Sequence, residues 1–192
     1  GIANPPATWD ELTAAGKALL AKQGPPRIMI SPSLDRYLPF HYAAGGSVVS
    51  EDGSQVTFDS PEGEEALTFY YGMYKDGIAT TSADAGAQWP GDGIAKGLAD
   101  IVFEGNWVVP FMQTSAPDLK YAIAEMPAGP KGKSTLAFTV CYAINSATKV
   151  ADAAWSVENY LVGTEGMTKW SSLGLAMPTR PALADAWSKQ FP

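Results

Sequence analysis

The sequence predicts an α/β fold, in which short apolar strands alternate with amphipathic helices. Apolar runs at residues 27–31 and 100–104 each lie between segments whose apolar side chains recur at helical spacing. This alternation is typical of a sheet whose strands are joined by helices. The chain has 192 residues and 46% hydrophobic content, which is enough for one domain or for two small ones.

The first helix is predicted to begin after Thr8, an N-cap residue that Glu11 follows three positions later, in the pattern of a capping box. The apolar side chains of this helix keep helical spacing: Leu12, Ala15, Leu19 and Leu20. Gly24-Pro25-Pro26 ends the helix. A strand at 27–31 follows, and it leads into a polar loop at 31–37.

A short helix is predicted from Arg36 or Tyr37 to Ala44, where Gly45-Gly46 breaks it. A β-hairpin then has strands at 47–49 and 56–58 and a turn at 51–54.

The next helix begins at Asp59 or Ser60, with Pro61 near its first turn, and runs to Lys75. Its core-facing stripe comprises Ala66, Phe69, Tyr70 and Met73. Residues 79–93 are rich in Gly, Ala and Ser and are predicted to form a loop that holds Trp89. A short helix then ends at Lys96-Gly97.

The second half of the chain begins with the strand at 100–104 and continues with two further strands, at 119–126 and 137–144. Cys141, the one cysteine, lies in the last of these and is predicted to be a small buried apolar residue. Two helices follow, at about 150–162 and 164–172.

Gly105-Asn106-Trp107 follows the strand at 100–104, and ligands of open α/β sheets bind beyond the carboxyl ends of the strands. An aromatic ring beside an amide suits a sugar, which has an apolar ring face and hydroxyl edges. The alternative is that Trp107 packs under the next helix, as buried tryptophans commonly do. Trp89 is open to the same two interpretations, since loops often carry function.

Composition excludes several classes of function. The net charge of −7 has the wrong sign for nucleic-acid binding, which needs a basic patch, so no nucleic-acid partner is expected. No apolar run approaches the roughly 18 residues of a membrane span. Gly91-Asp92-Gly93 lacks the pattern of a phosphate-binding loop and Asp52-Gly53 that of a calcium loop, so neither a cofactor nor a metal is expected.

Catalysis has weak support. His41 is the only histidine and no catalytic motif surrounds it, which favours a packed histidine or one whose hydrogen bonds are satisfied at the surface. Two carboxylates could hydrolyse a glycoside, and Asp35, Asp92 and Glu104 are the candidates. Acids near a sugar site more often accept hydrogen bonds from hydroxyls, so a binding module is favoured over an enzyme.

Several motifs occur in one order along the chain: Pro5-Pro6-Ala7-Thr8-Trp9, Gly45-Gly46, Gly105-Asn106-Trp107, Met126-Pro127 and Met177-Pro178-Thr179-Arg180. In order and spacing they resemble the extracellular solute-binding proteins of carbohydrate ABC importers, the family 1, maltodextrin-binding-like group. The resemblance covers nearly the whole chain. It implies a type II periplasmic-binding-protein-like lobe, a mixed sheet flanked by helices, together with part of a second lobe.

The resemblance also implies that the chain is a fragment that lacks most of the N-terminal lobe. Residues 1–134 would belong to the C-terminal lobe, and 135–177 would be a strand-helix-helix segment of the N-terminal lobe. Residues 178–192 would return to the C-terminal lobe. Without its partners, the segment 135–177 would expose apolar surface and favour self-association.

The function that the resemblance implies is that of a receptor in the periplasm or at the cell surface. Two lobes would close on a sugar or oligosaccharide, and a membrane permease would recognise the closed form. The implied substrate-binding residues are Trp107, Asn106, Asp35, Arg36, Ser33, Trp89 and Arg180. For Arg36 and Arg180, a solvated arginine or a pair with a neighbouring acid is an equal alternative.

Two other functions stay open on the sequence. One is a carbohydrate-active enzyme, similar to a glycoside hydrolase, that uses Asp35 or Glu104. The other is a structural or sensing module that has kept the fold and lost the ligand.

Overall fold

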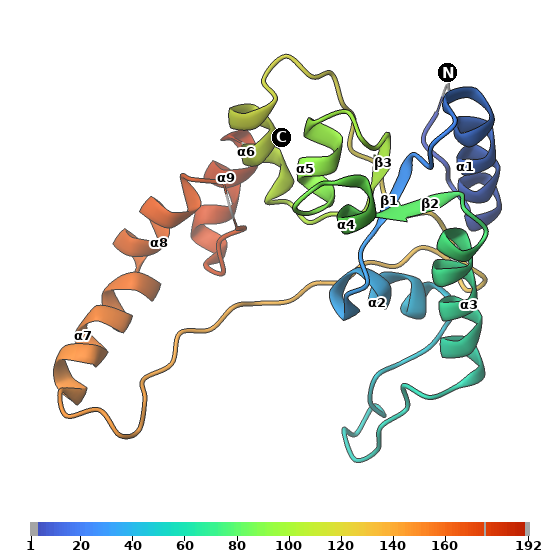
Figure 1. Cartoon of the computed structure of the whole chain (residues 1–192). Helices are drawn as coiled ribbons and strands as arrows, with labels where there is room; N and C mark the ends of the chain where they lie inside the picture. Colours follow the sequence, from blue (N-terminus) through green and yellow to red (C-terminus); the bar gives the residue numbers. More distant parts are fainter. Residues whose placement is uncertain (1–3, 175, 191–192) are drawn as a thin grey trace. The chain divides into compact units, whose positions relative to one another are not determined.

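The structure, a computed structural model, describes residues 4–174 and 176–190 (Figure 1). The chain divides into two compact units. The first comprises residues 1–104 and 118–137, and the second comprises residues 105–117 and 138–192. The assignment of 1–134, 135–177 and 178–192 to two lobes stays a prediction.

The first unit contains a three-stranded parallel sheet, with β1 (Ile28–Ile30) between β2 (Ala79–Thr81) and β3 (Ile101–Val102) (Figure 1). All three residues of β1 are buried, as expected for the central strand of a covered sheet. The α/β class is confirmed. Among the described residues, the strands of the sheet pair in parallel only, and antiparallel pairing is limited to isolated bridges.

Five helices of the first unit accompany this sheet: α1 (Trp9–Gln23), α2 (Leu34–Ala43), α3 (Pro61–Lys75), α4 (Ser82–Ala85) and α5 (Pro90–Ala95). The capping signals of the two longest are confirmed. The Thr8 hydroxyl accepts a hydrogen bond from the Glu11 amide, and Glu11 in turn accepts one from the Ala7 amide. Ser60 caps α3, whose Pro61 occupies the first turn.

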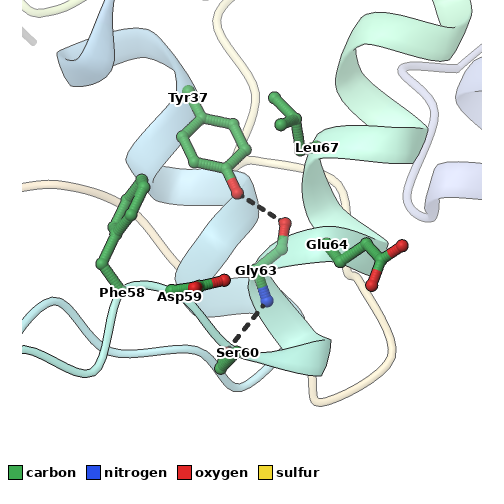
Figure 2. A pocket seen from close by; sticks show the side chains of 7 residues that line it. All are labelled: Tyr37, Phe58, Asp59, Ser60, Gly63, Glu64 and Leu67. Carbon is green, nitrogen blue, oxygen red and sulfur yellow. Dashed lines mark hydrogen bonds between the residues drawn. The ribbon is translucent and has the colours of Figure 1, made fainter.

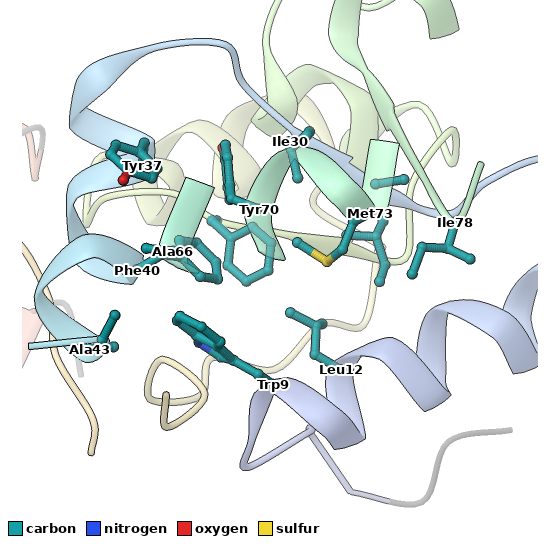
Figure 3. Close-up of a cluster of buried hydrophobic side chains, with 14 residues drawn as sticks. Trp9, Leu12, Ile30, Tyr37, Phe40, Ala43, Ala66, Tyr70, Met73 and Ile78 are labelled. Atoms are coloured by element: carbon teal, nitrogen blue, oxygen red, sulfur yellow. The ribbon is translucent and has the colours of Figure 1, made fainter. Parts of the chain in front are cut away.

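The core of the first unit lies where α1, α2 and α3 pack against the sheet (Figure 3). Figure 3 shows Trp9 and Leu12 of α1 on one side of this cluster and residues of α2 and α3 on the other. Phe40 of α2 is 1% exposed, and its ring contacts aromatic rings from α1, α3 and the end of β3. The predicted stripe on α3 is confirmed, since Ala66, Tyr70 and Met73 are buried and Phe69 packs against the cluster.

Two predicted boundaries in the first unit were wrong. Residues 79–93 are not a continuous loop, because β2 and α4 occupy most of the first half. The three residues of β2 carry no apolar run, and their strand state follows from parallel pairing with β1. Helix α2 begins at Leu34 rather than at Arg36 or Tyr37, so Asp35 and Arg36 lie in its first turn and not in a loop.

The predicted hairpin is reduced to a single antiparallel bridge, between Val49 and Val56. Its turn is held by Asp52, whose carboxylate accepts hydrogen bonds from the hydroxyl of Ser50 and from the backbone and hydroxyl of Ser54. These hydrogen bonds lower the pKa of Asp52 to about 2. A turn held by polar side chains is therefore present, but the two paired strands predicted at 47–49 and 56–58 are not.

The regular elements among the described residues of the second unit are helical: α6 (Val108–Ser115), α7 (Ala151–Val162), α8 (Thr164–Ser171), a 3₁₀ turn η1 (Pro181–Leu183) and α9 (Ala184–Gln190). The helices predicted at about 150–162 and 164–172 are confirmed as α7 and α8. No helix of the described residues is both long enough and apolar enough to cross a bilayer.

The strands predicted at 119–126 and 137–144 were wrong, as was the burial of Cys141. Both segments lie outside the strands of the structure, and Cys141 is exposed. Alternating apolar residues favour an extended backbone, but a strand also requires a neighbour to which its backbone can hydrogen-bond. The sheet of the described residues offers neither segment a neighbour.

Candidate functional site

Polar side chains follow the carboxyl ends of all three strands. Ser31 comes directly after β1, Ser82 comes directly after β2, and Glu104 lies two residues beyond β3. Because the strands are parallel and in register, their carboxyl ends meet at one edge of the sheet. Open α/β sheets bind their ligands at this edge.

A hollow of about 400 Å³ opens at this edge, over the ends of β1 and β2, and we call it the strand-edge hollow. Its volume lies within the range that small-molecule sites of proteins occupy, roughly 300–1,000 Å³. Its lining includes Ser31, Ser33, Asp35, Arg36, Ser82 and Trp89. The hollow therefore brings together four of the seven residues that the sequence analysis proposed, from α2, the preceding loop and the start of α5.

Tyr70 of α3 fixes the backbone at the floor of this edge. Its hydroxyl accepts a hydrogen bond from the Ser31 amide over 3.1 Å and donates one to the Ser31 carbonyl over 2.9 Å. The hydroxyl of Ser33 donates to that of Ser31. Burial raises the pKa of Tyr70 to about 12, so its hydroxyl stays protonated and able to donate. Sequence analysis assigned Tyr70 to the core and missed this role.

Arg36 is held by two acids. Its Nη2 donates to Oε2 of Glu104 over 2.6 Å, its Nε donates to Oε1 over 3.3 Å, and it forms an ion pair with Asp35. The Glu104 side chain is 2% exposed, whereas that of Asp35 is 43% exposed. For Arg36, the interpretation as the partner of a neighbouring acid is the one that the structure bears out.

Trp89 lies at the N-terminus of α5, and its ring covers Gly91. A Cβ atom built on Gly91 would lie 2.1 Å from the indole, so only glycine leaves room for the ring in this position. The Asp92 carboxylate interacts with neighbouring residues of the same segment: it accepts a hydrogen bond from the Gln88 amide and forms an ion pair with Lys96. These interactions lower the pKa of Asp92, with the hydrogen bond from Lys96 as the largest cause.

Asn106 and Trp107 lie in the second unit, at the start of α6. The predicted turn is present, with the Val108 amide donating to the Gly105 carbonyl over 3.0 Å. The Trp107 ring covers Gly105 and lies 5.9 Å from the ring of Phe138. Nδ2 of Asn106 is buried and has no hydrogen-bond acceptor among the described residues.

Arg180 also lies in the second unit, where its Nε donates to the carbonyl of Val162 over 2.9 Å. This hydrogen bond ties Arg180 to the last residue of α7. Arg180 is absent from the lining of the strand-edge hollow.

A second hollow, of about 540 Å³, lies beside the N-terminus of α3 (Figure 2). Figure 2 shows two hydrogen bonds in its lining: the Tyr37 hydroxyl donates to the Gly63 carbonyl, and the Gly63 amide donates to Ser60. The carboxylates of Asp59 and Glu64 also line it. Beneath it, His41 is fully buried and hydrogen-bonded to the Ser47 carbonyl, so the interpretation as a packed histidine is confirmed. We place the candidate site at the strand edge, because the carboxyl ends of the three strands meet there and four of the proposed residues line the hollow beside them.

No group of three or more His, Cys, Asp or Glu side chains in residues 4–174 and 176–190 is arranged to hold a metal ion. The polar groups of the strand-edge hollow are instead hydroxyls, the amide of Gln88, a carboxylate and a guanidinium. Together with the indole of Trp89, these groups suit a hydroxylated organic ligand.

Comparisons with known proteins identify the family. A sequence profile of the family described as bacterial extracellular solute-binding protein matches residues 2–192. A candidate binding protein of Brucella abortus (strain 2308) is 26% identical over 178 residues, which cover 89% of this chain and 43% of that protein. The family description and the name of this relative both refer to binding proteins.

Several solved structures match nearly the whole chain. The cyclic alpha-maltosyl-1,6-maltose binding protein from Arthrobacter globiformis has 25% sequence identity and a TM-score of 0.64, covering 98% of this chain and 50% of that one. An ABC transporter solute-binding protein from Thermotoga lettingae TMO, solved with alpha-D-tagatose, has 28% identity and a TM-score of 0.71, covering 97% and 49%.

The chain thus spans about half the length of the relatives that it matches. The similarity confirms the periplasmic-binding-protein-like fold that the order of motifs predicted. Because the profile matches all but the first residue, the chain belongs to the family of bacterial extracellular solute-binding proteins.

Proposed function

We propose that the protein is the substrate-binding component of an ABC importer, which binds a sugar or oligosaccharide and delivers it unchanged to a membrane permease. Family membership places the protein outside the cytoplasm. The observation that carries the proposal is the strand-edge hollow, where hydroxyls, the Asp35 carboxylate and the Trp89 indole face one cavity. The similar proteins of known ligand, a tagatose-bound protein and a maltosyl-maltose binding protein, support the same class of solute.

In this proposal each group has a stated role. Asp35 accepts hydrogen bonds from sugar hydroxyls, and Ser33 donates or accepts one. Trp89 offers its ring to the apolar face of a pyranose. Asn106, Trp107 and Arg180, which lie in the second unit, stay proposed ligand contacts on the strength of the resemblance.

The proposed mechanism is hinge closure. Two lobes close on the sugar, which excludes water, and the permease recognises the closed form. No group of the protein exchanges a bond with the ligand. The enzyme alternative, with Asp35 or Glu104 as the catalytic acid, gains no support from the relatives, and Glu104 is buried against Arg36.

Thermal unfolding with a panel of neutral sugars, including maltose and D-tagatose, tests the proposal on the full-length protein. A ligand at about one hundred times its dissociation constant stabilises the protein by roughly 2.7 kcal/mol, which raises the midpoint visibly. We expect Trp89→Ala, which removes the indole from the lining of the strand-edge hollow, to abolish the shift. Trp155→Ala, which removes an exposed tryptophan of α7, should keep it. If no sugar shifts the midpoint, the carbohydrate assignment is wrong.

We infer further that the apolar side chains of segment 135–177 mediate self-association of this 192-residue chain. On α7, Trp155 is 59% exposed and Val157 is 60% exposed. Light scattering after gel filtration should give a mass above one chain, which Trp155→Lys lowers toward the monomer. Ser156→Lys adds the same charge on the same helix and should leave the mass unchanged. A monodisperse monomer at every concentration would rule out the inference.

A further inference from the structure

The one positively charged side chain that lines the strand-edge hollow among the described residues, Arg36, is paired with acids of the protein itself. The guanidinium of Arg36 makes a two-point contact with Glu104 and an ion pair with Asp35. A planar guanidinium bound in this forked manner has a fixed orientation, and its donors point at the two acids. Arg36 therefore joins the end of β3 to the first turn of α2.

The two acids differ in their exposure to solvent. Asp35 is 43% exposed and lines the hollow, whereas Glu104 is 2% exposed and is absent from the lining. A buried carboxylate is stable only when it is paired and hydrogen-bonded, and Arg36 provides this pairing. Glu104 therefore affects the hollow indirectly. It fixes the position of Arg36, and Arg36 in turn orients Asp35.

The charge balance of these three residues is negative, since one guanidinium stands between two carboxylates. Asp35 and Arg36 are the charged residues among the described residues that line the hollow. An anionic ligand would face the carboxylate of Asp35 and would compete with Glu104 for Arg36. The negative charges of the ligand and of Asp35 would repel each other strongly inside one small hollow. A neutral hydroxyl, in contrast, can donate to Asp35 at no such cost.

We propose that Glu104 determines the charge class of the ligand: it neutralises Arg36, so that the strand-edge hollow accepts neutral polyhydroxylated solutes and rejects phosphorylated or acidic sugars. The proposal rests on the proposed function, because it concerns the ligand of the same site. It makes Glu104 a positioning and specificity residue that does not touch the ligand. Without the charge of Glu104, the two Arg36 donors that Glu104 now binds would be available to an anion, while Asp35 would remain paired with Arg36.

Calorimetric titration of the full-length protein tests this role, with maltose and D-tagatose as neutral probes and glucose 6-phosphate and inorganic phosphate as anionic probes. The unchanged protein should prefer the neutral probes by roughly tenfold or more. Glu104→Gln keeps the shape of the side chain and removes its charge. We expect this variant to gain at least about tenfold in affinity for both anions and to lose affinity for the neutral sugars. Added salt should weaken the gain.

Asp100→Asn is the matched control. Asp100 also pairs with an arginine across β1 and β3, with Nη2 of Arg27 2.7 Å from its Oδ1, but at the opposite end of the strands. This variant should leave the affinities for both classes of probe unchanged. A gain in anion binding there would show that the effect is one of overall charge, and it would overturn the proposal.

Two further outcomes bear on Glu104. A parallel loss of all probes in a folded Glu104→Gln variant would reduce Glu104 to a structural residue and overturn the proposal. Should Glu104→Gln fail to fold, Asp35→Asn removes the exposed acid from the same arginine, and it too should gain phosphate binding. Absence of that gain would also overturn the proposal.

The phosphate titration separates this proposal from the proposed function. If the unchanged protein binds no sugar, the assignment as a sugar receptor fails. A gain of phosphate binding in Glu104→Gln would still support the role of Glu104, and its absence would contradict it.

Discussion

Replacing Phe40 with alanine is expected to destabilise the protein by about 3–5 kcal/mol, the usual cost of removing a fully buried ring. Phe40 is 1% exposed. Its ring centroid lies 4.8 Å from that of Tyr70 and 5.1 Å from that of Phe103, the latter in an edge-to-face arrangement. One ring therefore joins α2 to α3 and to the end of β3, and its loss leaves a cavity that three elements border.

Urea unfolding followed by tryptophan fluorescence measures this effect, with Phe138→Ala as the control. Phe138 is 56% exposed, so its removal should cost less than about 1 kcal/mol. A cost for Phe40→Ala as small as that of the control would mean that α2, α3 and the end of β3 do not share one core.

Elements whose signals are local could be predicted from the sequence. The capping residues Thr8 and Ser60 act within a few positions of their own helices, and both helices begin where these residues predict. The apolar stripe of α3 is likewise a property of one helix. The same holds for α7 and α8, whose periodic segments are long enough to define their type.

Elements that depend on distant partners could not be predicted. The strand state of β2 comes from pairing with β1, some fifty residues away, and its own residues carry no strand pattern. The segments at 119–126 and 137–144 show the opposite case, because their pattern is strong but the described sheet offers no neighbour. The β-propensity of a segment favours an extended backbone, but the segment forms a strand only when its backbone pairs with a neighbouring strand.

The candidate site shows the same division. The rule that ligands bind beyond the carboxyl ends of strands led to Ser33, Asp35 and Arg36, and the structure places all three at one hollow. The partner of Arg36 could not be read from the sequence, since Glu104 lies 68 positions away. Sequence analysis considered Glu104 as a catalytic acid, whereas its burial makes it a counter-ion.

Tyr70→Phe is expected to destabilise the protein by roughly 1–3 kcal/mol, although it removes a single oxygen atom. The Tyr70 hydroxyl is bonded to both the amide and the carbonyl of Ser31. Phenylalanine would leave these two backbone groups without that partner at a partly buried position. Because Ser31 begins the segment that carries Ser33 and Asp35, we also expect weaker sugar binding, with faster amide hydrogen exchange at Ser31.

Tyr71→Phe is the matched control, since Tyr71 is the next residue of α3 and is 56% exposed. Its loss of a hydroxyl should leave stability within about 0.5 kcal/mol of the unchanged protein.

The pH dependence provides a second, independent check on Tyr70. Burial raises the pKa of Tyr70 to about 12, above the value near 10 of an unfolded tyrosine. A group with a raised pKa contributes its full stability below the unfolded pKa and loses it as the pH rises through the folded pKa. The stability difference between the unchanged protein and Tyr70→Phe should therefore be constant below pH 10 and shrink between about pH 10 and 12. A difference that stays constant through this window would mean that the hydroxyl is not buried against Ser31, and the strand edge would then lack the anchor on which the candidate site depends.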